Sequence, residues 1–251
     1  MSAKGSPGCT TVALALSAVW TEVLPSRRLL LAECDVAGGD IASGYLACAA
    51  DASRGVLGLA VTRSKDPLTA VWDQLLAFDD AGNRLLLQGL SDPRQAATAT
   101  SAWPQLAAAT PELVRQEPAV DLVMDLGRLH SQHEAQELWQ VADQLILVTR
   151  SSLSAVAQTQ AAVSELRDHD VSVRLTCMVV DEGHPYSGSE IAKALELPVL
   201  ATLPWDARAA NGFRGGGVPR STSPLLRSCR SLVNRLASSV TEPARAGVAR
   251  V

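Results

Sequence analysis

The chain of 251 residues is 47% hydrophobic and only 4% aromatic, and it carries a formal net charge of −4. This length and composition suit one large α/β domain with a sizeable core, and the scarcity of aromatic side chains excludes a base-stacking platform for nucleic acid. The five cysteines are odd in number and lack C-x-x-C spacing. They therefore exclude a disulfide framework or zinc site and favour free thiols in a reducing cytoplasm.

The chain opens on a glycine-rich loop, AKGSPGCTT at residues 3–11, which runs into the apolar stretch VALAL. A loop of this kind directs backbone N–H groups and a helix N-terminus into one cavity, where they bind an anion such as phosphate. A buried strand normally precedes such a loop, yet only three residues precede Lys4 here. We therefore expect a truncated first strand, in a sheet that is less stable for lacking it.

The rest of the chain alternates apolar runs with helical patterns, which is typical of a parallel sheet covered by helices. Helices are predicted at residues 10–23, 94–116, 131–142, 154–167, 189–195 and 224–240, with shorter pieces at 41–49, 56–62 and 67–78. Strands are predicted at residues 28–34, 84–88, 121–127, 144–149, 173–180 and 199–203, and a flexible loop at 212–217. The fold class is thus α/β, with a doubly wound, mostly parallel sheet. We expect one domain over residues 1–240 and a disordered tail over residues 241–251.

Carboxylates follow two of the predicted strands. Glu33 and Asp35 come after the strand at 28–34, and Asp125 lies near the end of the strand at 121–127. Open α/β sheets bind ligands beyond the carboxyl ends of their strands, and Mg²⁺ prefers carboxylate and hydroxyl oxygens. Together with Thr10 of the loop, these side chains make up the set that a magnesium nucleotide needs.

Five segments together resemble the MinD/ParA group of deviant Walker A ATPases, and within it the MinD-like proteins near the pilus-assembly group TadZ/CpaE. KGSPGCTT at residues 4–11 is similar to that family's loop, K-G-G-x-G-K-[ST]-[ST], and ECDVAGGD at residues 33–40 to its motif D-x-D-P-x-G-G-[DN]. DLG at residues 125–127 resembles its Walker B motif, ADQLILVT at 142–149 its next strand, and LPVLATLPWD at 197–206 its segment near the base. The resemblance implies a P-loop NTPase fold.

The same resemblance implies a site for ATP or ADP with Mg²⁺. Lys4 would reach across an ATP-bound homodimer to the phosphates of the other subunit, and Asp35 or Glu33 would position the hydrolytic water. The metal would be held by Thr10, Asp35 and Asp125. The nucleotide would lie against Gly5, Ser6, Pro7, Gly8, Cys9, Thr10, Thr11, Asp125, Asp181, Pro204 and Asp206.

Cys9 departs from the family's loop, because it stands where the in-loop lysine contacts the β- and γ-phosphates. Losing one charge-assisted phosphate contact weakens binding by roughly 1.5–3 kcal/mol, and the loss is larger in the transition state of hydrolysis. We interpret Cys9 as a small residue in a weakened or collapsed phosphate loop. A redox-sensing thiol, with its pKa lowered by the helix N-terminus, is the alternative. Whether the chain is an ATPase stays open.

The last fifth of the chain is basic. Residues 201–251 hold eight arginines against two acidic side chains, which leaves 14 basic and 24 acidic residues in the first 200. In the predicted helix at 224–240, apolar residues recur at helical spacing. We expect this stripe to pack on the domain, with contact to a membrane or to DNA as the alternative. The stripe consists of Leu225, Leu226, Cys229, Leu232, Val233 and Leu236.

We predict a cytoplasmic protein, or one peripheral at the membrane or nucleoid, because no apolar run approaches the roughly 20 residues of a membrane-spanning helix. Its expected function is that of a nucleotide-dependent, dimeric switch with weak or absent hydrolysis. Such a switch positions or partitions a partner assembly at a division site, on a chromosome, or in pilus or secretion machinery. The alternative is a non-catalytic interaction or scaffold protein that keeps the fold and binds no nucleotide.

Overall fold

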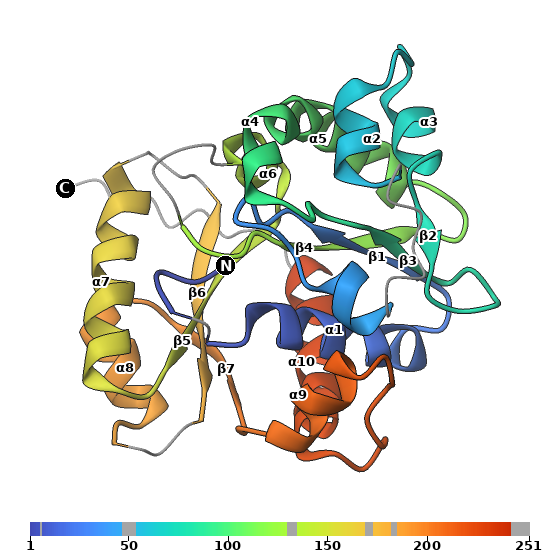
Figure 1. The fold of residues 1–251 in the computed structure, drawn as a ribbon. Coiled ribbons are helices and arrows are strands. Elements are labelled where there is room, and N and C mark those ends of the chain that lie inside the picture. The colour runs from blue at the N-terminus through green and yellow to red at the C-terminus, as the bar shows by residue number, and fades with distance from the viewer. Residues whose placement is uncertain (6, 47–53, 130–134, 169–172, 182–184, 242–251) are drawn as a thin grey trace.

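The computed structural model describes residues 1–5, 7–46, 54–129, 135–168, 173–181 and 185–241. Its strands form a four-stranded sheet in the order β2-β3-β1-β4 and a three-stranded sheet in the order β5-β6-β7 (Figure 1). All pairings within the two sheets are parallel except that of β2 with β3. The strands are β1 (Arg28–Glu33), β2 (Leu76–Ala77), β3 (Arg84–Leu87), β4 (Val120–Asp125), β5 (Gln144–Arg150), β6 (Arg174–Val180) and β7 (Val199–Leu203).

Met1 and Ser2 join the two sheets through backbone hydrogen bonds. Ser2 donates its N–H to the carbonyl of Gly127 at 2.8 Å and accepts from the N–H of Leu129 at 2.8 Å, just beyond β4. On the other side, the carbonyl of Met1 accepts from the N–H of Val148 in β5 at 2.8 Å. These two residues therefore hold a strand position between β4 and β5, and they place the glycine-rich loop at the carboxyl ends of the strands on both sides.

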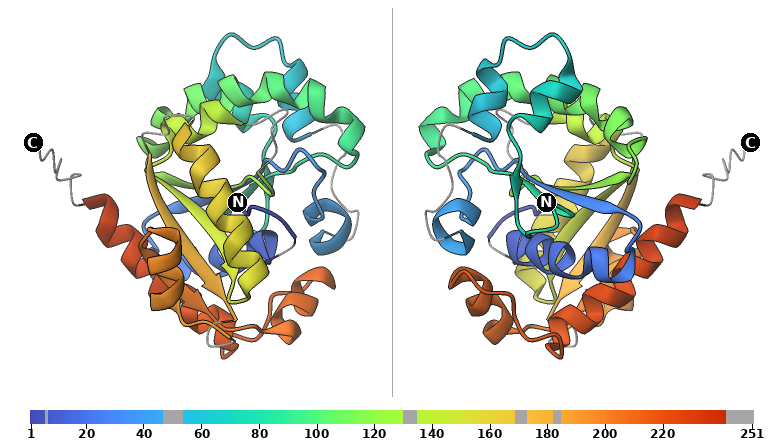
Figure 2. Two further views of the ribbon diagram at one scale, coloured as in Figure 1. Left: turned by 90° about the vertical axis from the view of Figure 1, so that its left-hand side faces the viewer. Right: turned by 90° about the vertical axis from the view of Figure 1, so that its right-hand side faces the viewer.

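Helices cover both faces of the sheets. Helices α1, α9 and α10 lie on one side of the four-stranded sheet and α2 to α6 on the other, while α7 and α8 pack on the outer face of β5–β7 (Figures 1 and 2). The helices are α1 (Cys9–Val23), α2 (Val56–Val61), α3 (Pro67–Trp72), α4 (Ala96–Ala99), α5 (Trp103–Val114), α6 (Gln136–Val141), α7 (Leu153–Asp168), α8 (Gly188–Leu195), α9 (Ala207–Arg214) and α10 (Pro224–Thr241). Shorter turns are η1 (Ile41–Tyr45, π-helical), η2 (Pro93–Gln95) and η3 (Thr100–Ala102).

Strand β1 shows why the sequence folds in this way. Its side chains from Leu29 to Ala32 are fully buried, and they alternate between two apolar clusters. Leu30 and Ala32 belong to the cluster beneath α5, whereas Leu29 and Leu31 belong to the cluster shared with α1 and α10. A strand with helices on both faces needs apolar residues at every position, because successive side chains point to opposite faces.

The structure corrects the predicted helix at residues 67–78. Helix α3 begins after Asp66, whose side chain accepts the N–H of Thr69 at 3.0 Å, and it ends at Trp72. Residues 76–77 instead form β2, which pairs with β3 in the antiparallel direction. A two-residue edge strand shows no hydrophobic period of its own, so the pairing partner alone decides its conformation.

Three further segments differ from the predicted elements. The predicted loop at 212–217 begins inside α9, where Phe213 is 1% exposed and anchors the helix. The predicted helix at 94–116 is divided into η2, α4 and η3 before α5 begins. Of the predicted helix at 41–49, residues 41–45 are π-helical and residues 47–49 lie outside the described residues. Residues 131–134 of another predicted helix and the tail at 242–251 also lie outside them.

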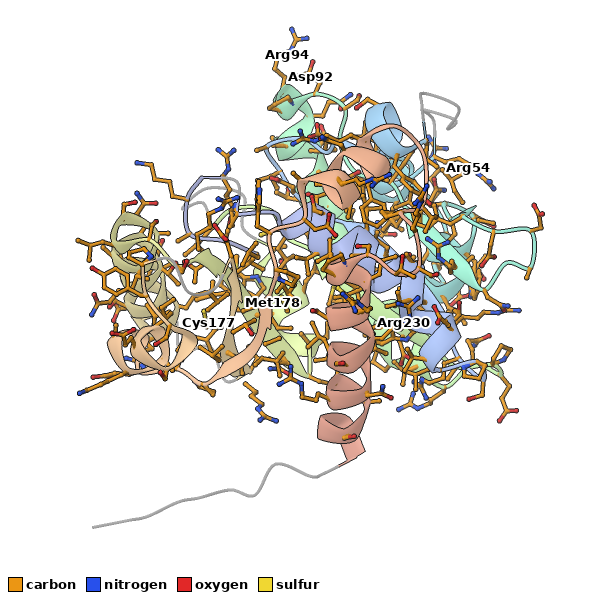
Figure 3. The ribbon with its side chains drawn as sticks, turned by 90° about the horizontal axis from the view of Figure 1, so that it is seen from below. Arg54, Asp92, Arg94, Cys177, Met178 and Arg230 are labelled. Atoms are coloured by element: carbon orange, nitrogen blue, oxygen red, sulfur yellow. The ribbon has the colours of Figure 1, made fainter. Side chains whose placement is uncertain are left out.

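The apolar stripe of α10 packs on the domain, which confirms the favoured interpretation of the C-terminal segment. Its side chains share one buried cluster with the inner face of α1. Arg230 (Figure 3) donates two hydrogen bonds of 2.9 Å to the carboxylate of Glu22 on α1, while Arg227 and Arg235 face solvent. Within the described part of the chain, no helix is both long enough and apolar enough to cross a bilayer. The buried residues of the stripe are Leu225, Leu226, Cys229, Leu232 and Val233.

Candidate functional site

Two glycines shape the loop that opens the chain. Gly5 has φ +75° and Gly8 has φ +104°, a left-handed backbone that favours glycine at both positions. Gly8 is the N-cap of α1, and its carbonyl accepts the N–H of Val12 at 2.9 Å. The N–H groups of the first helical turn have no carbonyl partner within the helix, so they remain to bind an anion. Pro7 of the loop is buried, and Ser6 lies outside the described residues.

Thr10 and Asp125 meet where the loop approaches the end of β4. The hydroxyl of Thr10 donates to Oδ2 of Asp125 at 2.6 Å, and the N–H of Gly127 donates to Oδ1 at 3.0 Å. Asp125 is 3% exposed. A buried carboxylate needs such donors, and this pair joins two positions that lie 115 residues apart in the sequence. The structure thus brings together the hydroxyl and one of the carboxylates that the sequence predicts for a metal.

Asp35 packs against the same glycine, Gly127. A Cβ atom at Gly127 would come within 2.0 Å of the carboxyl carbon of Asp35, so the carboxylate packs directly on the glycine backbone. Its Oδ1 accepts the N–H of Ala37 at 2.8 Å. The three predicted metal ligands, Thr10, Asp35 and Asp125, are therefore gathered around Gly127 at the carboxyl ends of β1 and β4.

This donor set fits Mg²⁺. The ion prefers oxygen ligands and keeps several waters, so one hydroxyl and two carboxylates beside a phosphate site provide enough protein oxygens. The described residues contain no group of three or more His, Cys, Asp or Glu side chains arranged to hold a metal by themselves. A metal at this place would need the Thr10 hydroxyl and phosphate oxygens beside the two carboxylates.

Cys9 begins α1 and packs inward. It keeps part of its surface exposed but lies against the apolar cluster shared by α1 and α10. Burial raises the pKa of the Cys9 thiol, and the charges of Asp125 and Asp35 raise it further. These effects outweigh the two that lower the pKa, which are the positive charge of the Met1 ammonium group and a hydrogen bond with Ser2. A reactive thiolate needs a lowered pKa, so the redox-sensor alternative loses its physical basis, and the interpretation of Cys9 as a space-filling residue gains support.

Lys4 and Thr11 flank the loop on its two sides. Lys4 is exposed, as a residue that reaches toward another subunit must be. Thr11 is half-buried next to Thr10 in the first turn of α1. Both positions are compatible with the roles that the sequence predicts for them.

The residues predicted near the base form a second group, at the carboxyl ends of β6 and β7. Asp181 has φ +66°, and its N–H donates to the carbonyl of Leu203 at 2.9 Å. Asp206, two residues beyond Pro204, accepts the N–H of Ala209 at 2.9 Å and caps α9. Its other oxygen accepts the hydroxyl of Ser223 at 2.7 Å, ahead of α10.

These bonds stabilise the ionised carboxylate of Asp206 and restrict its role. Burial works against its ionisation, but the hydrogen bonds from Ser223 and the backbone of Ala209 outweigh burial and lower its pKa. Both carboxylate oxygens are thus already used in joining α9 to α10. Asp206 therefore has a structural role where α9 and α10 meet, and a direct contact between Asp206 and the base remains a prediction.

The sequence reasoning missed one pair near this second group. The guanidinium of Arg150, at the end of β5, stacks over the ring of Trp205 at 3.8 Å from the ring centroid. Trp205 is still 52% exposed, so the pair forms a flat cationic and aromatic surface at the carboxyl ends of the strands. The only sequence signal was an isolated tryptophan just after a strand, because the arginine comes from a strand 55 positions earlier.

Glu33 is a deeply buried member of the predicted site. It is 2% exposed, and its carboxylate accepts the N–H groups of Ile41 at 3.1 Å and Gly89 at 3.0 Å. Burial raises the pKa of Glu33 from 4.5 to about 7 against the effect of these two bonds, and the negative charges of Asp125 and Asp40 add to the rise.

This raised pKa predicts a pH-dependent stability. Because folded Glu33 holds its proton up to about pH 7, its contribution to stability is complete below pH 4.5 and is lost as the pH rises toward 7. We expect the free energy of unfolding of the native protein to fall across this interval, relative to Glu33→Gln, by an amount on the order of 2–3 kcal/mol. Urea unfolding in metal-free buffer at a series of pH values measures the difference. Parallel curves for the two proteins would contradict the prediction.

Comparison with known proteins identifies the fold. Neither a family model nor a curated protein matches the sequence. Among solved structures, the MinD cell division protein of Aquifex aeolicus matches with a TM-score of 0.71 at 15% identity, over 95% of this chain and 94% of that one. A ParA family ATPase from Chlorobium tepidum TLS matches with a TM-score of 0.74 at 14% identity, over 94% and 96%. The septum site-determining protein MinD of Pyrococcus horikoshii OT3, complexed with Mg-ADP, matches with a TM-score of 0.67 at 19% identity, over 96% and 95%.

These matches confirm the predicted fold class. The chain has the α/β fold of the MinD and ParA ATPases, with a mixed, mostly parallel sheet and helices on both faces. Identities of 14 to 19% establish the fold alone. The roles of individual residues in this chain therefore rest on the geometry described above.

Proposed function

We propose that this chain binds an adenine nucleotide with Mg²⁺ and acts as a dimeric positioning or partitioning switch whose hydrolysis is weak or absent. The observation that carries the proposal is the 2.6 Å hydrogen bond between Thr10 and Asp125. It places a phosphate-loop hydroxyl and a strand-end carboxylate within reach of one metal ion, directly beside the open N-terminus of α1. A magnesium nucleotide needs that combination of groups.

The solved neighbours support this assignment by analogy. One is a MinD complexed with Mg-ADP, another is an ATP complex of a McdA variant from Cyanothece, and a third is a complex of MinC with MinD from Aquifex aeolicus. By this analogy, the chain pairs with a second copy through a bound nucleotide, with Lys4 reaching across, and acts on a protein partner. It works in the cytoplasm or at a membrane or nucleoid surface. We place it near the TadZ/CpaE group on the resemblance of its motifs alone.

A second function is favoured by Cys9. The loop lacks its lysine, and the Cys9 thiol packs inward against an apolar cluster. Both features suit a scaffold protein that has kept the fold and lost nucleotide binding. In that case the Thr10–Asp125 bond would serve stability alone. The two functions differ in one measurable property, which is stabilisation by Mg-ATP.

Thermal unfolding with and without millimolar Mg-ATP tests the choice. A ligand that binds only the folded state raises the unfolding temperature as its concentration exceeds Kd. We expect Mg-ATP to stabilise the native protein and to stabilise Thr10→Val much less, because valine keeps the shape of threonine without its hydroxyl. The matched control is Thr100→Val, which removes a hydroxyl that donates to the carbonyl of Ala97 far from the loop. No shift in the native protein would reject the nucleotide switch and leave the scaffold.

A further inference from the structure

Glu33 connects two segments that are far apart in the sequence. It is the last residue of β1, and its carboxylate accepts one N–H from Ile41, beyond the loop at residues 34–40, and one from Gly89, just beyond β3. At 3.1 and 3.0 Å, both bonds have ordinary lengths, and the side chain is 2% exposed. The carboxylate therefore holds the loop that carries Asp35 against the end of the neighbouring strand.

Two glycines form the socket for this carboxylate. A Cβ atom at Gly39 would lie 2.0 Å from the carboxyl carbon of Glu33, and one at Gly89 would lie 2.8 Å from its Cγ. Neither position has a left-handed backbone, so the space that Glu33 occupies is what requires glycine at both. Gly39 also donates its N–H to the carbonyl of Leu90 at 2.8 Å, which closes the contact between the two segments.

The length of the side chain is matched to this socket. A glutamate reaches the amides of Ile41 and Gly89 together, whereas an aspartate is one methylene shorter and would leave at least one buried N–H without its acceptor. Buried backbone donors are rarely left unpaired, because the loss of such a bond is expensive. The socket thus gives a physical reason for glutamate at residue 33, where the resembling family has aspartate.

We propose that Glu33 is a positioning residue, which fixes the loop at residues 34–40 and thereby sets the location of Asp35. Its two oxygens accept from backbone amides and are shielded from solvent, so Glu33 itself does not face a nucleotide or a water. Asp35 is two residues away, and its carboxylate packs on Gly127 beside the Thr10–Asp125 pair. The positioning itself rests on the contacts of Glu33 with Ile41, Gly39 and Gly89, and only its effect on Mg²⁺ rests on the proposed function.

Amide hydrogen exchange, followed by NMR on the nucleotide-free full chain, tests the positioning. In Glu33→Asp, we expect at least one of the N–H groups of Ile41 and Gly89 to exchange about tenfold faster or more, as the loss of a buried hydrogen bond implies. Glu33→Gln keeps the length and one acceptor oxygen, so protection should be lost at one amide only. Glu190→Asp is the matched control, because Glu190 also accepts a backbone N–H, that of Ser187 at 2.9 Å.

Two outcomes would overturn the positioning role. One is unchanged exchange at Ile41 and Gly89 in Glu33→Asp. The other is an equal acceleration throughout the protein, including the amide of Val179 in the core of β6, which would mean a general loss of stability. Should the aspartate variant fail to fold, the same comparison in Glu33→Gln decides the question.

A second readout separates positioning from simple structural support. With ATP present, we expect Glu33→Asp to raise the Mg²⁺ concentration needed for half-maximal binding by about tenfold, while ATP binding without Mg²⁺ stays unchanged. An unchanged Mg²⁺ requirement would overturn the link to Asp35. If the native protein binds no nucleotide at all, the proposed function fails, and the exchange experiment still decides whether Glu33 positions the loop.

Discussion

Replacing Cys9 by lysine is expected to tighten Mg-ATP binding by about 10- to 150-fold, equivalent to roughly 1.5–3 kcal/mol. Cys9 is the first residue of α1 and directly follows Gly8, whose φ of +104° turns the chain into the helix. A lysine there can extend toward a phosphate bound at the open helix end. Its ammonium group supplies the charge that the thiol lacks, while Thr10 and Asp125 are already in place for the metal.

The matched control for this substitution is Cys9→Met. Methionine is similarly long and unbranched but uncharged, so it reports the effect of filling the same space without the ammonium group. Isothermal titration of both variants with Mg-ATP measures the difference, which should shrink as salt is added, because screening weakens exposed charge pairs. Equal affinities for the lysine and methionine variants would mean that the loop is collapsed beyond residue 9, and would favour the scaffold function.

The fold was predictable wherever local pattern and tertiary environment agree. The run from Leu29 to Ala32 is apolar at every position, and a strand buried on both faces accounts for it fully. The stripe of α10 was equally predictable, because its spacing matches one helical face and that face packs on α1. In both cases a few neighbouring residues contain the whole signal.

The elements that were missed depend on distant partners. Strand β2 exists because β3 offers it an edge, and α9 persists through Gly212 because Asp206 caps it and Phe213 is buried. Neither partner is visible within a short window of sequence. Local patterns favoured a longer helix in one case and a loop in the other.

The candidate site shows the same contrast between features that local sequence predicts and features that depend on distant residues. The order of loop, strand-end carboxylate and second carboxylate predicted that Thr10, Asp35 and Asp125 would converge, because parallel strands end at one edge of a sheet. The sequence could not predict that Glu33 turns inward, since that depends on glycines 6 and 56 positions further along the chain. Nor could it predict that both oxygens of Asp206 are used as caps.

Truncating Leu232 to alanine is expected to lower the free energy of unfolding by about 3–5 kcal/mol, the range seen when a fully buried leucine is cut back in a packed core. Leu232 is 0% exposed and lies in the cluster that joins α10 to α1. Its loss leaves a cavity between two helices that Arg230 and Glu22 also hold together. Urea unfolding measures the change.

Arg235→Ala is the matched control for α10, because Arg235 is exposed three residues further along the same helix and should change the free energy of unfolding by less than about 0.5 kcal/mol. The contrast between the two variants separates a helix that belongs to the core from one that only rests on it. If Leu232→Ala cost less than about 1 kcal/mol, the stripe would be free to leave α1, and contact with a membrane or DNA would return as its role. A large loss of unfolding free energy would instead mean that the apolar face of α10 is part of the core. Only the outward-facing arginines of α10 would then be available to a partner.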